Sequence, residues 1–239
     1  MTASDQKLDQ KIEEASSLIR GTLMAYSDPA CVTCSFQTEC MAVVDLLIAQ
    51  KPDIPVLFLD TGYHFAETYA YRDQMTRDLK LNLVKLLPKL TVPEQESQFG
   101  ILNQTAPDRC CGMRKVAPLF SGLDGYGVWF TALRREQSPT RANLQPLDQF
   151  RLPTGKHLLK VSPLADWTSA DVWAYLKGRG IPVLPLYDQG YTSIGCKPCT
   201  SLPLTADDLR SGRWQGKKLE CGIHIQAEAG NAGEVTHAS

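Results

Sequence analysis

The chain alternates short, strongly apolar segments with longer segments of helical periodicity, and this order limits the fold more than any other feature. Buried strands are predicted at residues 30–36, 56–60, 83–87 and 127–133. Helices are predicted before the first strand, at residues 8–23, and between the following strands, at residues 41–48 and 65–79. Strands that alternate with helices predict an α/β fold with a mostly parallel sheet and helices on both faces.

The pattern becomes less regular after residue 140, where prolines divide the chain into short pieces. One further helix is predicted there, with Thr168 or Ser169 as its N-terminal cap and Gly178 or Gly180 at its end. We expect the remainder to form an irregular C-terminal segment.

The chain length favours one domain. The 239 residues suffice for a single α/β domain of ordinary size. We expect this domain to span residues 1–225, with an N-terminal helix at residues 5–26. Residues 226–239 are rich in Ala and Gly and are predicted to form a flexible tail.

Charge and hydropathy exclude several classes of function. The formal net charge of -1 gives no general attraction to nucleic acid. No apolar run approaches the roughly 20 residues that cross a bilayer, and the polar N-terminus has no signal-peptide pattern. We therefore expect a cytoplasmic protein without a nucleic-acid or membrane partner. The sequence leaves the oligomeric state open and allows a homo-oligomer.

Polar residues follow three of the predicted strands at the point where each strand ends. These loops contain residues 35–39, 60–62 and 134–138. Ligands of parallel sheets bind outside the carboxyl ends of the strands, so we expect the three loops to meet at one cleft.

Two cysteine pairs stand out among the eight cysteines. Cys110 and Cys111 are adjacent, and Cys196 and Cys199 form a C-x-x-C pair. Four thiolates suffice for one zinc ion or one iron–sulfur cluster, and two unrelated pairs of buried thiols are the structural alternative. Adjacent cysteines suit a cluster better than a single ion, because separate iron atoms take separate thiolates.

A second C-x-x-C pair, Cys31 and Cys34, lies inside the first predicted strand. Residues three apart in a strand point to opposite faces, so these two thiols cannot easily share one ion. We interpret them, and Cys40, as structural cysteines.

Cys221 has a different setting. It lies on a polar segment with Lys217, Lys218 and His224 nearby. Basic neighbours favour the thiolate, and an exposed segment would make it accessible, so Cys221 is a candidate nucleophile. An incidental surface cysteine is the alternative.

Several basic residues predict an anion site. Arg134 and Arg135 follow a buried strand at the expected ligand edge, and arginine matches phosphate and sulfate oxygens well. Residues 35–39 stand between a strand and a helix N-terminus, where backbone N–H groups can hold an anion, although the loop lacks the Walker glycines. His64 and His157 have no partner spacing and are interpreted as structural.

Five short motifs in the right order resemble the iron–sulfur type of assimilatory adenylylsulfate (APS) reductase, within the wider PAPS/APS reductase family. The resemblance covers about residues 30–225. The motifs are Ser35-Phe36-Gln37-Thr38-Glu39, Leu59-Asp60-Thr61-Gly62, Cys110-Cys111-Gly112-Met113-Arg114-Lys115, Arg134-Arg135-Glu136-Gln137-Ser138 and Glu220-Cys221-Gly222-Ile223-His224. The first loop usually ends in Glu-Asp in this family, whereas Glu39 is followed here by Cys40.

This resemblance implies a fold similar to the adenine nucleotide alpha-hydrolases, a cofactor and a reaction. It implies a [4Fe-4S] cluster on Cys110, Cys111, Cys196 and Cys199. It also implies that Cys221 attacks the sulfur of APS, that AMP leaves, and that thioredoxin or a glutaredoxin-like reductant then releases sulfite in the pathway to cysteine.

Substrate-binding residues implied by the motifs belong to the three loops and to basic positions farther along the chain. They are Ser35, Phe36, Gln37, Thr38, Glu39, Leu59, Asp60, Thr61, Gly62, Lys115, Arg134, Arg135, Arg210, Arg213 and His224. Phe58 and Leu59 are expected to line the base pocket.

Three other functions compete with this interpretation. A PAPS reductase, or an enzyme that accepts both substrates, shares most of the motifs. A tRNA thiolation enzyme of the ATP-pyrophosphatase type requires a Ser-Gly-Gly-x-Asp-Ser loop, which residues 35–40 do not supply. A zinc-binding module without enzyme activity explains four cysteines and leaves Cys221 and the arginines without a role.

Overall fold

The computed structural model describes residues 3–205, 208, 210–214 and 222–224. The expected tail at residues 226–239 and the candidate nucleophile Cys221 lie outside these residues. Within the described part of the chain, no helix is long and apolar enough to cross a membrane.

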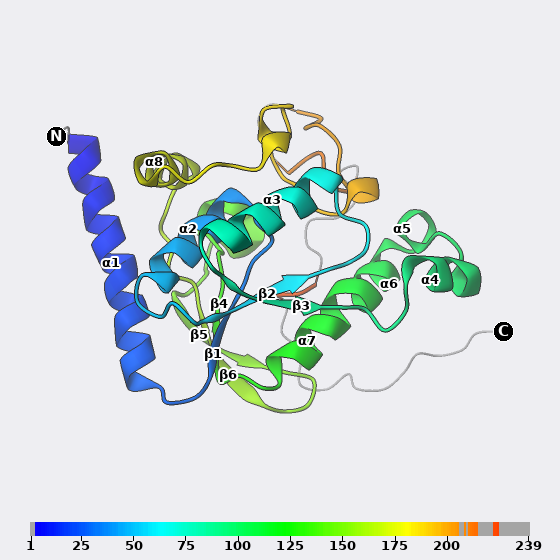
Figure 1. Ribbon diagram of the computed structural model, residues 1–239, viewed down its shortest axis with the longest axis horizontal. Helices are drawn as coiled ribbons and strands as arrows, with labels where there is room; N and C mark the ends of the chain where they lie inside the picture. Colours follow the sequence, from blue (N-terminus) through cyan, green and yellow to red (C-terminus); the bar gives the residue numbers. More distant parts are fainter. Residues whose placement is uncertain (1–2, 206–207, 209, 215–221, 225–239) are drawn as a thin grey trace.

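A six-stranded sheet forms the centre of the molecule, with strand order β3-β2-β1-β4-β6-β5 (Figure 1). Five strands are parallel, and β5 pairs antiparallel with β6 at one edge. The strands are β1 (Ala30–Thr33), β2 (Pro55–Leu59), β3 (Asn82–Leu86), β4 (Val128–Phe130), β5 (Leu147–Arg151) and β6 (His157–Val161). The prediction of a mostly parallel sheet is confirmed.

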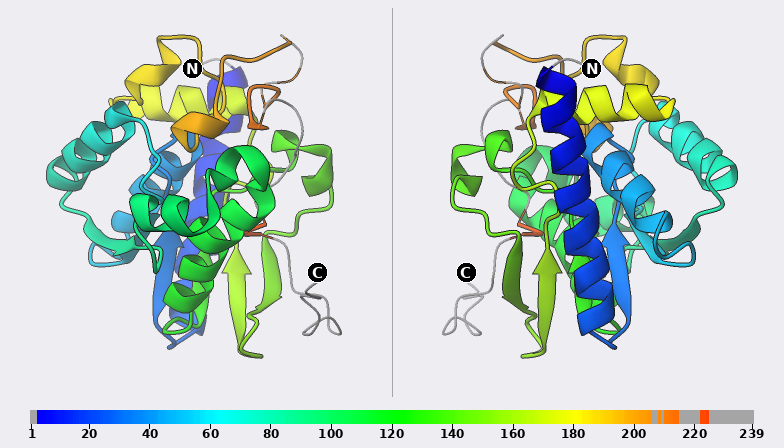
Figure 2. Two further views of the ribbon diagram at one scale, coloured as in Figure 1. Left: turned by 90° about the vertical axis from the view of Figure 1, so that its right-hand side faces the viewer. Right: turned by 90° about the vertical axis from the view of Figure 1, so that its left-hand side faces the viewer.

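Helices cover both faces of the sheet, as the alternation of elements predicts. One face is covered by α1 (Ala3–Ala25), α2 (Thr38–Ile48), α3 (Ala66–Asp78) and α8 (Ser169–Arg179). The other carries α7 (Ala117–Leu123). The two views of Figure 2 turn α7 and α1 toward the reader from opposite sides.

The side chains of the central strands alternate between two hydrophobic cores. In β1, Ala30 and Val32 face the core under α1, α2, α3 and α8, whereas Cys31 faces the core under α7. Cys34 lies with the first core, so Cys31 and Cys34 are on opposite sides of the sheet. The prediction that these two cysteines point to opposite faces of the sheet is confirmed.

Residues 92–123 contain helices that the sequence patterns do not reveal. They are α4 (Val92–Phe99), α5 (Leu102–Thr105), α6 (Pro107–Cys111), a π-helical turn (Gly112–Val116) and α7. A π turn within a helix widens the backbone locally and is frequent at functional sites. Here it immediately follows the adjacent cysteines and carries Arg114 and Lys115.

The hairpin β5–β6 is also absent from the predicted elements. β5 is an edge strand with mostly exposed side chains, and β6 contains a buried lysine, Lys160, among apolar residues. Neither strand therefore has the apolar pattern on which the prediction relied. After α8, the described chain contains only short 3-10 turns at Pro185–Tyr187 and Lys197–Cys199, as expected for an irregular segment.

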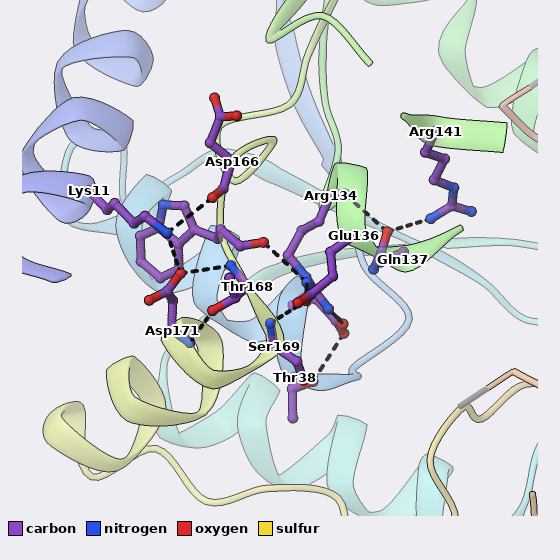
Figure 3. A network of polar contacts seen from close by, with 12 residues as sticks. Lys11, Thr38, Arg134, Glu136, Gln137, Arg141, Asp166, Thr168, Ser169 and Asp171 are labelled. Carbon is purple, nitrogen blue, oxygen red and sulfur yellow. Dashed lines mark hydrogen bonds and ion pairs between the residues drawn. The ribbon is translucent and has the colours of Figure 1, made fainter. Parts of the chain in front are cut away.

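A buried arginine joins the loop after β4 to the start of α2 (Figure 3). Arg134 is 4% exposed. Its guanidinium donates to Glu39 Oε1 at 2.9 Å and to Glu136 Oε2 at 2.6 Å. Because Glu136 also accepts from the backbone N–H of Ser169 at 2.6 Å, the same network reaches the N-terminus of α8.

The N-terminus of α8 is also held by its own capping residues and by α1. Thr168 is its N-terminal cap, and Thr168 and Asp171 form a capping box. Lys11 of α1 pairs with Asp171 at 2.5 Å, which joins the N-terminal helix to the same network (Figure 3). α8 ends at Gly180 in the left-handed conformation, one of the two predicted ends.

The Arg134–Glu39 pair makes stability depend on pH. Burial alone would raise the pKa of Glu39, but the hydrogen bond and charge of Arg134 hold it below the ordinary value of 4.5. A carboxylate with a depressed folded-state pKa stabilises the protein above its unfolded-state pKa. This contribution disappears as the pH falls through the folded-state pKa.

We predict that Glu39→Gln lowers the free energy of unfolding by roughly 3 kcal/mol at pH 7, because it removes one partner of a buried ion pair. The difference from wild type should shrink as the pH falls below about 4.5, measured by urea unfolding between pH 7 and about pH 3. The control is Glu136→Gln, whose half-exposed carboxylate binds the same guanidinium. It should cost about 1 kcal/mol or less. Equal losses for the two variants, or a loss independent of pH, would contradict this account.

Candidate active site

A cleft of about 1040 Å³ lies at the carboxyl ends of β1, β2 and β4, where the three polar loops meet as predicted. Eleven of the predicted substrate-binding residues line it. They are Ser35, Gln37, Thr38, Glu39, Leu59, Thr61, Lys115, Arg134, Arg210, Arg213 and His224.

Phe36 and Arg135 are not among the residues that line the cleft. Phe36 is fully buried, and its ring packs edge-on against Phe58 with centroids 5.6 Å apart. This packing holds the loop in place although Phe36 has a φ of 59°, which is unfavourable for a residue with a β-carbon. Arg135 pairs instead with Asp166 and donates to the carbonyl of Leu144 at 2.8 Å.

Asp60 and Gly62 also lie outside the cleft lining. Asp60 Oδ1 accepts hydrogen bonds from Tyr69 Oη at 2.7 Å and from the Gly62 N–H at 3.3 Å. The carboxylate therefore fixes the turn and attaches it to α3. Gly62 has a φ of 73°, and a β-carbon there would lie 2.9 Å from Val92, so this turn requires glycine.

Residues 190–195 and Tyr187 also form part of the cleft wall, and the sequence patterns did not assign them to the site. Arg141 lines the cleft as well. The run Gly-Tyr-Thr-Ser-Ile-Gly at residues 190–195, immediately before the second cysteine pair, is the signal that was available. His64 also lines the cleft. Its Nε2 donates a hydrogen bond to the Leu59 carbonyl at 2.8 Å. Burial lowers the pKa of His64 to about 4, so its ring is neutral at pH 7.

The N-terminus of α2 opens toward this cleft. Gln37 is its N-terminal cap but does not cap the helix with its side chain. The Gln37 amide instead donates to Ser35 Oγ at 3.0 Å and accepts from the Ile194 N–H at 3.0 Å. It therefore joins the loop after β1 to residues 190–195. A helix N-terminus at the wall of a cleft is suited to an anionic group.

The four predicted metal-binding cysteines line a second, smaller cavity behind the cleft. Cys110 and Cys111 end α6, and Cys196 precedes a 3-10 turn that ends at Cys199. Burial raises the pKa of the Cys199 thiol to about 11, and the negative charges of the other three thiolates contribute to this increase. The structure therefore brings together the four thiols that lie in two distant parts of the sequence.

The arrangement of these thiols fits a cluster better than a single ion. Among the described residues, no group of three or more His, Cys, Asp and Glu side chains is arranged to hold a metal ion. A zinc site needs its thiolates around one atom, whereas an iron–sulfur cubane binds each thiolate at a separate iron. The donor set, three buried thiols and the half-buried thiol of Cys199 around one cavity, fits the second case.

The cleft and the cysteine cavity share part of their walls. Lys115 and Trp214 line both spaces. Thr61 is fully buried, and its hydroxyl lies 3.2 Å from the Cys196 sulfur. Arg114 supports this wall, because its Nε donates to the Thr61 carbonyl at 2.5 Å. A charge in the cysteine cavity would therefore be felt at the cleft.

Residues 210–214 form one side of the cleft and pack against the second cysteine pair. A β-carbon on Gly195 would lie 2.2 Å from the Arg213 guanidinium, so glycine is what allows this close approach. Arg213 also stacks on Trp214 at 4.5 Å. Ser201 N–H donates to the Gly212 carbonyl at 2.9 Å and holds the segment in place.

Positive charge dominates the described wall of the cleft. Lys115, Arg141, Arg210 and Arg213 line it in addition to Arg134, whose charge is matched by Glu39 and Glu136. Apolar side chains from β2, Leu57, Phe58 and Leu59, line the same space. A cleft with these two properties can bind a ligand that has a flat apolar ring and several negative charges.

The candidate nucleophile Cys221 lies outside the described residues, but the three residues after it are described. Ile223 and His224 line the cleft. The His224 ring stacks on Trp129 with centroids 5.4 Å apart and an interplanar angle of 14°. The motif that contains Cys221 therefore reaches the cleft.

Comparison with known proteins agrees with this geometry. The sequence profile of the phosphoadenosine phosphosulfate reductase domain matches residues 29–202. The adenosine 5′-phosphosulfate reductase of Streptomyces coelicolor is 41% identical over 228 residues and aligns with 94% of both chains. The enzyme of the same name from Bacillus pumilus is 44% identical over 219 residues, which cover 90% of this chain and 93% of that protein.

Solved structures support the fold. The phosphoadenylyl-sulfate reductase of Candida auris superposes with a TM-score of 0.67 and 22% identity, over 82% of this chain and 97% of that chain. The FMN adenylyltransferase of Candida glabrata has a TM-score of 0.63 and 15% identity, over 95% and 78% of the two chains. With the profile match and the curated relatives, the chain belongs to the phosphoadenosine phosphosulfate reductase family.

Proposed function

We propose that this protein reduces adenylylsulfate to sulfite and AMP in sulfate assimilation, with Cys221 as nucleophile and a thioredoxin-type protein as reductant. The single observation that carries this proposal is the cationic cleft that shares a wall, at Thr61 and Lys115, with a cavity lined by four cysteines. Relatives that are 41–44% identical carry the name adenosine 5′-phosphosulfate reductase. The proposal places the protein in the cytoplasm, where thiols are kept reduced.

The substrate has two parts, and the cleft has a matching region for each. The adenine ring would lie against Phe58 and Leu59 at the end of β2. The phosphate would accept hydrogen bonds from backbone N–H groups of residues 35–39 at the start of α2. The sulfate would then lie toward Lys115, Arg210 and Arg213 on the side of the cysteine cavity.

The reaction begins with attack of the Cys221 thiolate on the sulfur of adenylylsulfate. A sulfur–sulfur bond forms, the bond from sulfur to the phosphate oxygen breaks, and AMP leaves with the electron pair. One thiolate of the reductant then attacks the Cys221 sulfur, sulfite leaves with the electron pair of the sulfur–sulfur bond, and a mixed disulfide forms. The second thiolate attacks the reductant's sulfur in that mixed disulfide, closes the disulfide of the reductant and releases the Cys221 thiolate, so the reductant supplies the two electrons.

Cationic side chains make the first step feasible, because an anion attacks an anion. Lys115 and Arg213 would offset the charge of the sulfate oxygens and of the leaving phosphate. Arg134 has a different part in this scheme. Its guanidinium is committed to Glu39 and Glu136, so it positions the start of α2.

Cys110, Cys111, Cys196 and Cys199 would hold a [4Fe-4S] cluster. When bound, such a cluster would cross-link α6 to the turn at residues 196–199 and influence Lys115 electrostatically. The thiols would have to lose their protons on binding, and burial raises the pKa of Cys110 and Cys199. Cluster assembly would therefore release protons and stabilise the fold.

PAPS differs from adenylylsulfate by a 3′-phosphate, so the substrate specificity of the protein depends on whether the cleft accepts that group. The names of the curated relatives and the cysteine quartet support adenylylsulfate. A sulfite-release assay that compares the two substrates, with reduced thioredoxin and anaerobic protein, decides between them. Greater sulfite release from PAPS than from adenylylsulfate would contradict the proposed specificity.

We predict that Cys221→Ser releases sulfite more slowly by more than about a thousandfold, because the hydroxyl cannot replace the thiolate as nucleophile. The variant should still bind AMP, measured by isothermal titration calorimetry. Cys40→Ser is the matched control, since Cys40 lines the same cleft but has no role in the reaction. Loss of turnover in Cys40→Ser, with turnover kept in Cys221→Ser, would assign the nucleophile to the loop after β1.

We predict that Cys111→Ala loses iron and lowers the melting temperature by roughly 5–10 °C, because ligand binding contributes to folding. Cys31→Ala, a fully buried thiol on the α7 side of the sheet, should keep its iron. Iron per chain and the visible spectrum of anaerobically purified protein measure both effects. Iron loss in Cys31→Ala alone would overturn the proposed ligand set.

A further inference from the structure

The three residues that follow Cys221 are attached to the sheet on the side of α7. Ile223 packs against the second hydrophobic core. His224 stacks on Trp129 of β4, and its carbonyl accepts a hydrogen bond from Lys160 Nζ of β6 at 3.4 Å. Figure 2 shows these residues as a short red segment beside the end of β6. Both the ring and the main chain of His224 are therefore held by strands.

Trp129 offers His224 a rigid surface. It is fully buried, and its indole N–H donates to Thr33 Oγ1 of β1 at 3.0 Å. Phe150 packs edge-on against the indole with centroids 5.2 Å apart. The position and the plane of the indole are thus fixed by neighbouring strands before His224 stacks on it.

Lys160 completes this surface. Its ammonium group lies 5.4 Å from the centre of the Trp129 ring and 5.2 Å from that of Phe150. Two cation–π contacts in a buried setting hold the ammonium group in place. The hydrogen bond to the His224 carbonyl then fixes the backbone three residues after Cys221.

His224 contributes a neutral aromatic ring to this contact. Burial lowers its pKa well below 6.5, and the charges of Lys160, Arg141 and Arg210 lower it further. Its Nδ1 atom is buried and has no hydrogen-bond partner among the described residues. The stacked face of the ring, rather than a nitrogen atom, therefore makes the contact that the structure shows.

Gly222 places a turn between Cys221 and this contact. It has a φ of 90°, a conformation that residues with a β-carbon rarely adopt. A β-carbon there would lie 3.5 Å from Val116, which is an ordinary van der Waals contact. Glycine is therefore required by the backbone angle and not by lack of space. Cys221 is covalently bonded to Gly222, so the attachment of residues 222–224 restricts where its thiol can go.

We propose that Trp129, Lys160 and His224 form an anchor that positions the Cys221 thiol for attack, with His224 as a positioning residue that acts through its ring. This inference rests on the proposed function, because it assigns a task to the nucleophile. It replaces the substrate contact that the sequence motif implies for His224 with a contact to the sheet.

Two variants of His224 separate the ring from its nitrogen atoms. His224→Phe keeps a neutral ring that can stack on Trp129 and removes both nitrogens. His224→Asn keeps a polar atom near the position of Nδ1 and removes the ring. With adenylylsulfate and thioredoxin, we expect kcat for His224→Asn to fall by at least about tenfold, with KM within about threefold. His224→Phe should recover most of that loss. The reverse order, with Asn active and Phe inactive, would assign a chemical role to a nitrogen and overturn the anchor.

A second measurement does not depend on turnover. Iodoacetamide alkylates an accessible thiolate, and peptide mass spectrometry gives the rate at Cys221 in the protein without nucleotide. The anchor predicts faster alkylation in His224→Asn and in Lys160→Met than in wild type, with His224→Phe close to wild type. Equal melting temperatures of the four proteins show that each variant is folded. Equal rates in all four would overturn the anchor. If wild type releases no sulfite from adenylylsulfate, the proposed function fails and the alkylation rates still test the anchor.

Discussion

Parallel pairing of β2, β1 and β4 is the constraint on which the rest of this molecule depends. Because the three strands run in one direction, their carboxyl ends lie at one edge, and every loop that follows them opens there. Ser35, Leu59, Thr61 and Arg134 come from separate parts of the sequence and line one cleft for this reason. The N-terminus of α2 and the segment at residues 210–214 complete its wall.

The basic residues at this edge have two different tasks. Arg134 is buried between Glu39 and Glu136 and holds together α2, α8 and the loop after β4. Lys115 and Arg213 lie at the boundary with the cysteine cavity, where a positive charge can act on a bound anion. The first task fixes the frame of the cleft, and the second acts on what the cleft binds.

Local sequence patterns predicted the strands around the cleft. The features they did not predict depend on contacts between residues far apart in the sequence. The apolar runs of β1, β2 and β4 and the opposite faces of Cys31 and Cys34 followed from strand periodicity. The buried charge of Lys160 concealed β6, although its aromatic neighbours Trp129 and Phe150 explain how the charge is accommodated. Arg134 and Arg135 are adjacent and indistinguishable in sequence, yet only Arg134 lines the cleft, because Asp166 holds Arg135 outside it. The partners that separate them are 30 or more residues away along the chain.

The central claim is that Cys221 takes the sulfonate group from adenylylsulfate before any reductant arrives. The most direct test is to incubate the anaerobic protein with adenylylsulfate alone, digest it, and locate the added mass by peptide mass spectrometry. The account predicts one sulfonate per chain on the peptide that contains Cys221, released as sulfite when reduced thioredoxin is added. A sulfonate on Cys34 or Cys40, or no adduct while sulfite still forms with thioredoxin, would contradict it.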